Sequence, residues 1–378
     1  MRENRVRCAL TGLGAMGKKY ALWLDQGEIE AMDLTAVLCH SDETASWAKE
    51  HLRAKVVRSE EEMYENGDLF DAVIIATPHR LHPPIAIKAM QEGKHVMCDK
   101  PAGILMDDAA RMDELAKEKY LVLGSMCHQR TYESHIRIKR LLDEKAIGDV
   151  TRVFMENTMF FRTRRYHESS SWRSSWSKEG GGALINQGYH LIDFWQDLFG
   201  LPESIYACIP FGKGNDFKVD DEVTMLMEYP GKMTGTLILS TIEGCGKNVL
   251  EIIGTKGRII LDDQLQVTTF NQDVKDYIQH ANVASRQDLK ETNVSYPVVE
   301  QTKPYHIMLE NFRDAILHGI ELIAPARDGV SALSMINAAY LSAWQEKKIK
   351  LPIDMEEYKF LLKQKEESEV VNYVGNKM

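Results

Sequence analysis

Apolar residues in the first third of the chain occur in short runs that alternate with segments of helical spacing. The run at residues 7–11 predicts a first strand, and residues 18–26 predict a helix directly after it. Strands that alternate with helices are typical of βαβ units, so we predict an α/β domain with a parallel sheet. Further strands are expected at residues 34–38, 72–76, 95–98 and 121–124, and further helices at residues 83–92 and 107–119.

The pattern changes after Ser134, where longer runs alternate between apolar and polar residues. This alternation predicts a second α/β domain with a large, open, mainly antiparallel sheet. Helices with an apolar face are expected to cover one side of that sheet. The alternating runs lie at residues 150–160, 222–229 and 232–241, and the helices at residues 188–199, 305–318 and 329–347.

Two segments lack a clear pattern. Residues 273–294 are polar and are interpreted as a mobile surface insertion, and the residues after Asp354 are interpreted as a charged tail that packs late or not at all. We therefore expect a first domain at residues 1–127, a second at residues 128–354 and a tail at residues 355–378.

Composition excludes several classes of function. The 378 residues, 44% of them hydrophobic, are enough for two packed domains. The net charge of -10 argues against a nucleic-acid partner, because such a surface is normally basic. Residues 1–7 are polar and basic, and the apolar run after them leads straight into a glycine turn, so we expect no signal peptide, no transmembrane helix and a cytoplasmic protein.

The six cysteines give no sign of a metal site. They are scattered, with no CxxC pair and no clustering with histidine, so we expect buried thiols and no metal ligands. They are Cys8, Cys39, Cys98, Cys127, Cys208 and Cys245.

A glycine turn follows the first expected strand and opens the first expected helix. Gly12 permits a tight turn, Gly14 lets a ligand approach the backbone, and Gly17 lets the helix pack on the strand. In this context the GxGxxG pattern predicts a dinucleotide whose pyrophosphate lies at the helix N-terminus. The first domain is therefore expected to be a Rossmann domain.

The end of the second expected strand leaves the choice of dinucleotide open. An acidic residue here normally binds the ribose 2′-OH of NAD, but the chain has Cys39 at that position, followed by His40 and Ser41. A 2′-phosphate could accept hydrogen bonds from His40 and Ser41, yet no arginine stands ready to pair with it. Either NAD or NADP is permitted, with a small preference for NAD.

Two further motifs resemble a known family. Cys98-Asp99-Lys100-Pro101 follows an expected strand, and the run from Gly180 to Asp193 reads GGGALINQGYHLID. Both resemble motifs of the Gfo/Idh/MocA family, relatives of glucose–fructose oxidoreductase and inositol dehydrogenase. The likeness extends from the glycine turn through Thr77-Pro78 to Leu351-Pro352. The resemblance implies hydride transfer at a secondary alcohol or carbonyl of a sugar, cyclitol or glycoside.

The resemblance places Lys100 and His190 on the family's catalytic lysine and histidine. Their chemistry suits the reaction, because oxidising an alcohol requires a base for the hydroxyl proton and a cation near the developing alkoxide. Asn186 replaces the family's usual aspartate. If a helix has begun by Asn186, its amide shares a face with His190 and can orient the imidazole, without the charge that would stabilise an imidazolium.

Other residues are expected to contact cofactor or substrate. The pair Trp172-Arg173 resembles the family's Trp-Arg element near the cofactor, although a loop packing on the sheet would explain it equally well. The expected cofactor-binding residues are Gly12, Gly14, Ala15, Met16, Gly17, Cys39, His40, Ser41, Thr77, Pro78, His79, His82, Asp99, Lys100, Trp172 and Arg173. For His79 and His82 a solvated loop position is slightly favoured.

Substrate contacts are expected from the segment after the last Rossmann strand and from a basic loop at residues 162–167. That loop could bind an anionic or aromatic part of a substrate, although a solvated basic loop is the more ordinary interpretation. The expected substrate contacts are His128, Arg130, Arg164, Tyr166 and Gln187, with Asn337 and Tyr340 on the last helix as further candidates.

The leading hypothesis is an NAD(P)-dependent dehydrogenase of a sugar or glycoside. The Asn186-Gln187 pair resembles a branch of the family associated with oxidation at the glucosyl 3-position. One alternative is a hydrolase or lyase whose tightly held NAD oxidises the sugar transiently, and another is a dinucleotide-sensing regulator without catalysis. The family resemblance also suggests a homodimer or homotetramer formed through the second sheet.

Overall fold

The chain forms two compact units, each described by itself below. The computed structural model describes residues 4–375, with side chains up to Glu369. The first unit comprises the residues up to Thr131 together with Lys178–Gly180 and Lys303–Leu333. The second comprises Tyr132–Ser177, Gly181–Thr302 and the residues from Ser334 onward.

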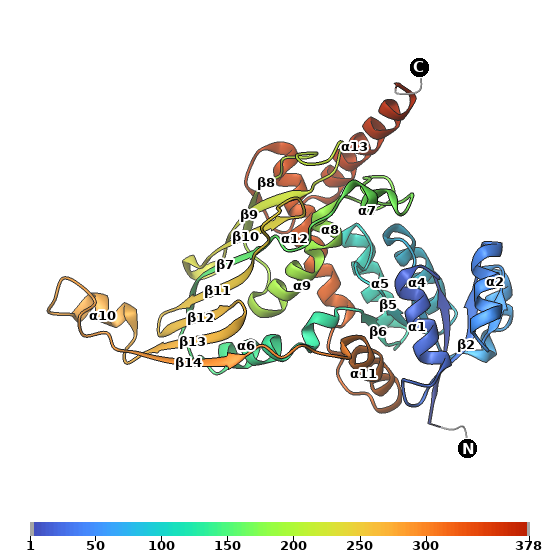
Figure 1. The fold of residues 1–378 in the computed structure, drawn as a ribbon, viewed down its shortest axis with the longest axis horizontal. Coiled ribbons are helices and arrows are strands. Elements are labelled where there is room, and N and C mark those ends of the chain that lie inside the picture. Colours follow the sequence, from blue (N-terminus) through green and yellow to red (C-terminus); the bar gives the residue numbers. More distant parts are fainter. Residues whose placement is uncertain (1–3, 376–378) are drawn as a thin grey trace. The chain divides into compact units, whose positions relative to one another are not determined.

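The first unit is built on a six-stranded parallel sheet in the order β3-β2-β1-β4-β5-β6. Figure 1 labels β2, β5 and β6 of this sheet. This order is that of the Rossmann fold, so the predicted parallel α/β domain is confirmed. The apolar runs form strands because both faces of the sheet are covered, which buries most of the strand residues. The strands are β1 Val6–Thr11, β2 Met32–Leu38, β3 Lys55–Val57, β4 Ala72–Ile75, β5 His95–Cys98 and β6 Leu123–Ser125.

Helices connect these strands and bury their apolar faces on the sheet. Met90 on α4 and Met112 on α5 are fully buried in the same core cluster as Val73 and Val96 of the strands. The helices of this unit include α1 Ala15–Asp25, α2 Asp42–His51, α3 Glu60–Glu65, α4 His82–Gln91, α5 Met106–Glu118 and α11 Pro304–His318. Short 3-10 helices lie at η1 Gly67–Leu69, η2 His79–Leu81 and η3 His128–Thr131.

Helix α11 corrects one expectation. It was expected to cover the second sheet, but it belongs to the first unit, where His306 Nε2 lies 3.1 Å from Glu28 Oε2 and Arg313 donates to the carbonyl of Glu30. Met308 and Phe312 form its buried face. Apolar spacing shows that a helix has a buried face, but it carries no information on which sheet that face meets.

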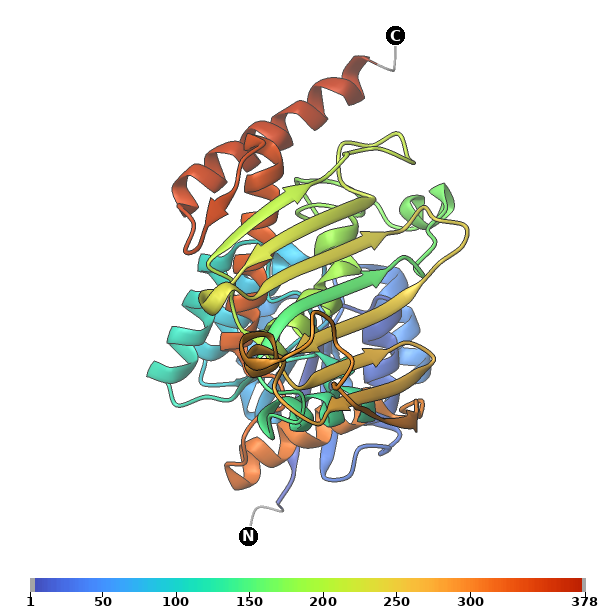
Figure 2. The ribbon, with the colours of Figure 1, turned by 90° about the vertical axis from the view of Figure 1, so that its left-hand side faces the viewer.

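The second unit is built on a nine-stranded sheet in the order β14-β13-β12-β11-β7-β10-β9-β8-β15, seen face-on in Figure 2. All its neighbours are antiparallel except β7 and β10, which are parallel. The large, mainly antiparallel sheet is therefore confirmed. The strands are β7 Val150–Asn157, β8 Ser204–Cys208, β9 Glu222–Glu228, β10 Thr234–Ser240, β11 Asn248–Gly254, β12 Gly257–Leu261, β13 Gln264–Phe270, β14 Glu291–Pro297 and β15 Ile349–Lys350.

Helix α9 packs on one face of this sheet. A Cβ added at Gly235 of β10 would lie 2.5 Å from the ring of Trp195, and one at Gly188 would lie 2.7 Å from Leu239. These glycines therefore allow the helix to approach the strand closely. The helices of this unit include α6 Glu133–Asp143, α7 Arg164–Glu168, α8 Ala183–Asn186, α9 Gly188–Phe199, α10 Val274–His280 and α13 Met355–Gly375, with a 3-10 turn η4 at Pro230–Lys232. Helix α12, Ala326–Gln345, begins in the first unit and continues in the second.

Three further expectations are corrected. The expected tail forms helix α13, in which Tyr358 is fully buried, whereas residues 376–378 lie outside the described residues. The polar segment 273–294 lies at the surface as expected, but it is not without regular structure, since it contains α10 and the start of β14, which pairs with β13. Cys208 and Cys245 are exposed, because Cys208 points outward from β8 and Cys245 lies in the loop before β11.

The described residues contain neither a membrane-spanning helix nor a cluster of metal ligands. No helix among them is long and apolar enough to cross a membrane. No group of three or more histidine, cysteine or acidic residues within residues 4–375 is arranged to hold a metal ion.

Candidate active site

The glycine turn joins β1 to α1 in a conformation that requires glycine at two positions. Gly12 has φ +94°, and a Cβ there would lie 2.5 Å from the backbone of Ala76. A Cβ at Gly17 would lie 1.8 Å from the carbonyl oxygen of Gly12. Gly14 differs, because a Cβ there would meet nothing within 4 Å. The turn is therefore closed on its protein side and open at Gly14.

These residues fit a dinucleotide. Helix α1 begins at Ala15, with Gly14 as its N-cap, so its first N–H groups and positive dipole face the open side of the turn. The backbone of Thr77, whose side chain carries a hydroxyl, lies beside the turn, since an added Cβ on Gly12 would be 2.6 Å from Thr77 N. That hydroxyl is buried and has no hydrogen-bond partner among the described residues. A bound pyrophosphate and ribose would supply acceptors for these donors.

Gly14→Ala should leave the fold intact and weaken dinucleotide binding about tenfold or more, because its Cβ meets open space that the ligand needs. The measurement is NADH affinity by fluorescence titration beside the thermal melting temperature. Gly17→Ala is the contrasting variant, since its Cβ collides with the turn itself and should lower the melting temperature. A Gly14→Ala protein with unchanged affinity for both NADH and NADPH would contradict this reading.

An arginine that the sequence analysis missed lies at the end of β2. Arg58, just after β3, donates from Nη2 to the carbonyl of His40 at 3.3 Å and to Asp42 Oδ1 at 2.8 Å. Ser41 is the N-cap of α2 and accepts from Thr44 N. Cys39 is 1% exposed. Sequence separation hid this arginine, because it reaches the end of β2 only through the pairing of β2 with β3.

Lys100 follows β5 at the same edge of the first sheet as the glycine turn. Asp99 Oδ1 accepts from the backbone N–H of Lys100 at 2.8 Å, and the Tyr20 hydroxyl donates to Asp99 Oδ2 at 3.3 Å. Burial raises the pKa of Asp99, and the charges of Lys100 and His82 oppose that rise. The carboxyl group of Asp99 therefore fixes the backbone that carries Lys100.

His79 and His82 are not solvated loop residues, which corrects the slightly favoured interpretation. They are 4% and 1% exposed. The ring nitrogens of His82 lie 2.7 Å from the carbonyl of Pro101 and 2.6 Å from that of Thr77. Burial lowers the pKa of His82, while the hydrogen bond to Pro101 opposes the shift. His82 thus ties the loop after β4 to the loop that carries Lys100.

Asn186 and His190 lie on one continuous helical path in the second unit. Gln187, between α8 and α9, has φ -73° and ψ -43°, so the backbone stays helical from Ala183 onward. Residues four apart then share a face, which is the condition set above for Asn186 to orient His190. Both side chains are half-buried.

Asp220 anchors the start of this helical path and was missed by the sequence analysis. Its carboxylate accepts from Gly182 N at 2.8 Å, Leu184 N at 2.6 Å and the Tyr340 hydroxyl at 2.8 Å. Burial raises the pKa of Asp220, and these three hydrogen bonds oppose the rise. The adjacent acids Asp220 and Asp221 are visible in the sequence, but nothing there shows which backbone amides they bind.

Tyr166 on α7 brings several predicted residues together. Its hydroxyl oxygen accepts from Arg173 Nη1 at 2.8 Å, from Gln187 Nε2 at 2.9 Å and from Asn186 Nδ2 at 3.4 Å. Arg164, in contrast, is exposed and pairs with Glu168, as expected for a solvated loop.

The loop that carries Trp172 and Arg173 is held by the C-terminal helix. Glu369 on α13 accepts from the backbone N–H groups of Trp176 at 2.6 Å and Ser177 at 3.2 Å. The indole of Trp176 is buried and donates to the carbonyl of Lys218. The segment interpreted as a tail thus positions a predicted part of the site.

The remaining substrate candidates have mixed surroundings. His128 stacks on Tyr305, with ring centroids 4.2 Å apart, and burial together with the charge of Lys100 lowers its pKa to about 4. Arg130 is buried and pairs with Asp328 at 2.5 Å, which points to a structural role. Tyr340 donates to Asp220 and is fully buried, in keeping with helix packing.

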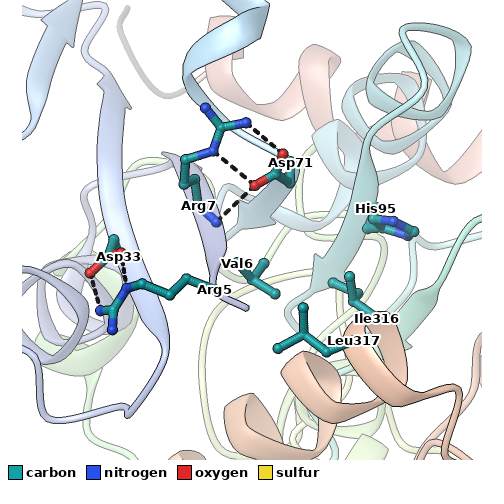
Figure 3. Close-up of a pocket in the computed structure, with 8 residues that line it drawn as sticks. All are labelled: Arg5, Val6, Arg7, Asp33, Asp71, His95, Ile316 and Leu317. Carbon is teal, nitrogen blue, oxygen red and sulfur yellow. Dashed lines mark hydrogen bonds and ion pairs between the residues drawn. The ribbon is translucent and has the colours of Figure 1, made fainter. Parts of the chain in front are cut away.

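A cavity of about 440 Å³ lies apart from these residues (Figure 3). It is at the amino-terminal edge of the first sheet, where β1 begins, whereas the glycine turn follows the carboxyl-terminal end of β1. Its charged side chains pair with one another, Arg5 with Asp33 and Arg7 with Asp71. It therefore contributes nothing to the candidate site. The lining residues are Arg5, Val6, Arg7, Asp33, Asp71, His95, Ile316 and Leu317.

The fold and the glycine turn define a two-domain, Rossmann-type oxidoreductase, and comparison with known proteins gives the family. The model described as "Oxidoreductase family, NAD-binding Rossmann fold" matches residues 6–126, and that of the "GFO/IDH/MocA C-terminal domain" matches residues 135–260. The two matches together cover well over half of the chain. The chain belongs to the Gfo/Idh/MocA family of oxidoreductases, which confirms the resemblance.

Several relatives have names that describe an activity. Trans-1,2-dihydrobenzene-1,2-diol dehydrogenase of Oryctolagus cuniculus is 31% identical over 56% of this chain and 61% of its own length. The scyllo-inositol 2-dehydrogenase (NADP(+)) IolW of Bacillus subtilis is 26% identical over 79% and 83%. The chain spans about half, 51%, of an uncharacterized oxidoreductase of Schizosaccharomyces pombe.

Solved structures share the fold over nearly the whole chain. The WlbA dehydrogenase of Bordetella pertussis, in complex with NADH and UDP-GlcNAcA, has a TM-score of 0.77 at 22% identity and covers 93% of this chain and 100% of its own. A levoglucosan dehydrogenase, in complex with NADH and levoglucosan, has a TM-score of 0.74 at 23% identity, covering 92% and 100%. At these identities the likeness shows the fold.

Proposed function

We propose that this protein is an NAD(P)-dependent dehydrogenase that oxidises a secondary alcohol of a sugar, cyclitol or glycoside. The observation that carries the proposal is the glycine turn, closed toward the protein and open at Gly14, in a chain that also presents Lys100 and a helical Asn186–His190 face. The names of the relatives support a polyhydroxylated substrate.

Each proposed catalytic residue has a distinct role. His190 takes the hydroxyl proton, because imidazole titrates near neutrality. Lys100 supplies a positive charge toward the oxygen on which alkoxide character develops. A bound NAD or NADP would supply the acceptor for the hydride, and the residues around Gly12 and Gly14 would hold it. Asn186 orients His190 through its carbonyl oxygen, since its amide nitrogen donates to Tyr166.

A substrate panel tests this function. Sugars, cyclitols and glycosides are incubated with the protein and either NAD or NADP, and reduced cofactor is followed by absorbance. Reduced cofactor with at least one class of substrate is expected, and none with any class would overturn the proposal. Glucosides that are oxidised are then analysed for the 3-keto product, which the Asn186-Gln187 pair favours.

The same preparation tests the redox-assisted alternative. Purified protein is examined for retained dinucleotide, and turnover is followed with and without added cofactor. A dehydrogenase needs added NAD or NADP and leaves that cofactor in the reduced state. Retained cofactor and product formation without net reduction would instead support a hydrolase or lyase.

We further propose that Arg58 allows the site to accept NADP. Its guanidinium lies beside His40 at the end of β2, where no carboxylate occupies position 39 to repel a 2′-phosphate. Its present partner, Asp42, is 97% exposed, so that ion pair is weak and can be exchanged for a phosphate.

Arg58→Ala should lower kcat/KM with NADP about tenfold or more while leaving kcat/KM with NAD nearly unchanged. Steady-state kinetics with both cofactors measure the ratio. Arg111→Ala, an exposed arginine on α5 of the same unit, controls for the loss of one positive charge. Equal losses with both cofactors would argue against a 2′-phosphate contact.

We also propose that the protein assembles as a homodimer or homotetramer through the sheet of the second unit. Tyr206 of β8 and Leu226 of β9 are directly paired across strands and are 41% and 50% exposed. Exposed apolar residues grouped on one sheet face favour a protein contact. Light scattering on the purified protein gives the mass of the assembly.

A further inference from the structure

The hydroxyl of Tyr166 is surrounded by donors. Its three partners, the Arg173 guanidinium and the side-chain amides of Gln187 and Asn186, all donate to the Tyr166 oxygen. A guanidinium can only donate, so the direction of the Arg173 bond is unambiguous. The hydroxyl keeps its own hydrogen and can donate it to an acceptor outside these residues. Tyr166 is only half-buried, so a ligand can reach it.

This hydroxyl lies next to the proposed catalytic face. Asn186 is one helical turn before His190 on the path that Gln187 keeps helical. A ligand that accepts the Tyr166 hydrogen therefore lies near the group proposed to take the substrate proton. The inference below rests on the proposed function, because it concerns the substrate of that same site.

Arg162 adds an uncompensated positive charge. Its guanidinium carbon lies 4.5 Å from the centre of the Tyr166 ring, and its backbone N–H donates to the carbonyl of Thr241 just after β10. Its Nε is buried without a hydrogen-bond partner. Within the part of the chain that the structure describes, Arg162 forms no ion pair, and its only side-chain hydrogen bond goes to the Phe161 carbonyl at 3.3 Å. Charges that are partly buried normally have a partner.

The surrounding loop does not neutralise that charge. Residues 160–168 contain three arginines and one glutamate in a chain whose net charge is -10. The glutamate, Glu168, already pairs with Arg164. His167 does not carry a compensating negative charge in any state, and burial together with Arg173 lowers its pKa. Residues 160–168 therefore carry a net positive charge on an acidic protein, and Asp221 is the acid whose charge acts on His167.

We propose that Arg162 and the Tyr166 hydroxyl form a subsite for an anionic group on the sugar substrate, a carboxylate or a phosphate. Arg162 pairs with the anion, and Tyr166 donates to one of its oxygens. An anionic substrate group would also explain why the chain has Asn186 where the family usually has an aspartate. A carboxylate at position 186 would accept the Tyr166 hydrogen and repel the substrate anion, whereas Asn186 donates to Tyr166 and is neutral.

The test is binding by isothermal titration calorimetry to protein saturated with NADH. Glucuronate, glucose 6-phosphate and glucose are the three ligands, so the two anionic ligands separate a carboxylate from a phosphate. Wild-type protein should bind at least one anionic sugar about tenfold or more tightly than glucose. Arg162→Gln should remove that preference. Tyr166→Phe should weaken the binding of the same anionic sugar, although it keeps the ring that Arg162 stacks on.

Arg165→Gln is the matched control, because it removes one charge from an exposed arginine of the same loop. Its preference for the anionic sugar should be retained. Circular dichroism and the melting temperature identify any variant that fails to fold. If the Arg162 variant does not fold, raising the salt concentration tests the same charge in the wild type, whose preference should weaken.

The outcomes separate the two proposals. Equal affinity for all three ligands, or a preference that survives Arg162→Gln, overturns the anionic subsite whether or not the protein turns over. If the wild-type protein oxidises neutral sugars but shows no preference for an anionic sugar, the proposed function is supported and the anionic subsite is overturned. If the wild-type protein binds an anionic sugar preferentially but reduces no cofactor with any substrate, the subsite is supported and the proposed dehydrogenase function is overturned.

Discussion

Replacing His190 with alanine should lower kcat by about 10²- to 10⁴-fold, because the substrate proton would have no positioned acceptor. Affinity for the dinucleotide should be nearly unchanged. The glycine turn that binds the pyrophosphate belongs to the first unit, whereas His190 belongs to the second. The expected signature is thus a catalytic defect without a cofactor-binding defect.

Steady-state kinetics and NADH titration on the same preparation measure the two quantities. His280→Ala is the matched control, since that histidine is exposed on α10 and its ring nitrogen Nδ1 lies 2.9 Å from the carbonyl oxygen of Asp276 on the same helix. Its kcat should equal that of the wild type. Normal turnover by the His190 variant would remove this residue from the mechanism.

Asp220→Ala should have the largest effect on stability. The change removes the acceptor for Gly182 N, Leu184 N and the Tyr340 hydroxyl, all in a fully buried position. Leaving buried donors unsatisfied costs about 1–3 kcal/mol each, so the free energy of unfolding should fall by about 3 kcal/mol or more. The released helix start should also displace Asn186 and His190 and lower kcat.

Urea unfolding followed by circular dichroism measures the change. Asp220→Asn is informative because it keeps the shape but places an amide donor opposite one of the backbone donors, so it should also destabilise the protein. Asp263→Ala, an exposed aspartate between β12 and β13, is the control and should change stability by less than about 0.5 kcal/mol. A wild-type unfolding curve for Asp220→Ala would show that this carboxylate does not anchor the helix.

The Rossmann half was predicted because its signals are local. An apolar run, a glycine turn and an amphipathic helix follow one another within residues 7–26, and five of the six parallel strands were expected from apolar runs. The sixth, β3, has only three residues and was missed. Helix α11 was also found, but it was assigned to the wrong sheet. Its partners, such as Glu28, lie far away in the sequence, and spacing alone does not select between two apolar surfaces.

The C-terminal helix was missed because its composition misleads. Residues 355–369 are mostly charged and polar, which resembles a solvated tail. The helix is nevertheless held by a few specific contacts. Tyr358 stacks on Trp344, and Glu369 caps the loop at Trp176. Such contacts depend on partners that only the fold brings within reach.

The same division holds for the candidate site. Lys100, Asn186 and His190 were assigned by motif, and they remain predictions that the proposed kinetics test. Tyr166 and Gln187 were named separately, and the structure joins them at one hydroxyl oxygen. No single short segment contains that arrangement.

The sequence by itself determined the chemistry that is encoded over a few neighbouring residues. It determined a dinucleotide turn at Gly12 and Gly14, the family and the large second sheet, because strand, turn and helix signals act within one or two turns of chain. The tertiary structure alone decided which distant side chains meet. It brought Arg58 to the end of β2, Asp220 under the start of α8, and Arg162 onto Tyr166, since hydrogen bonds and ion pairs depend on distances that strand pairing and packing set.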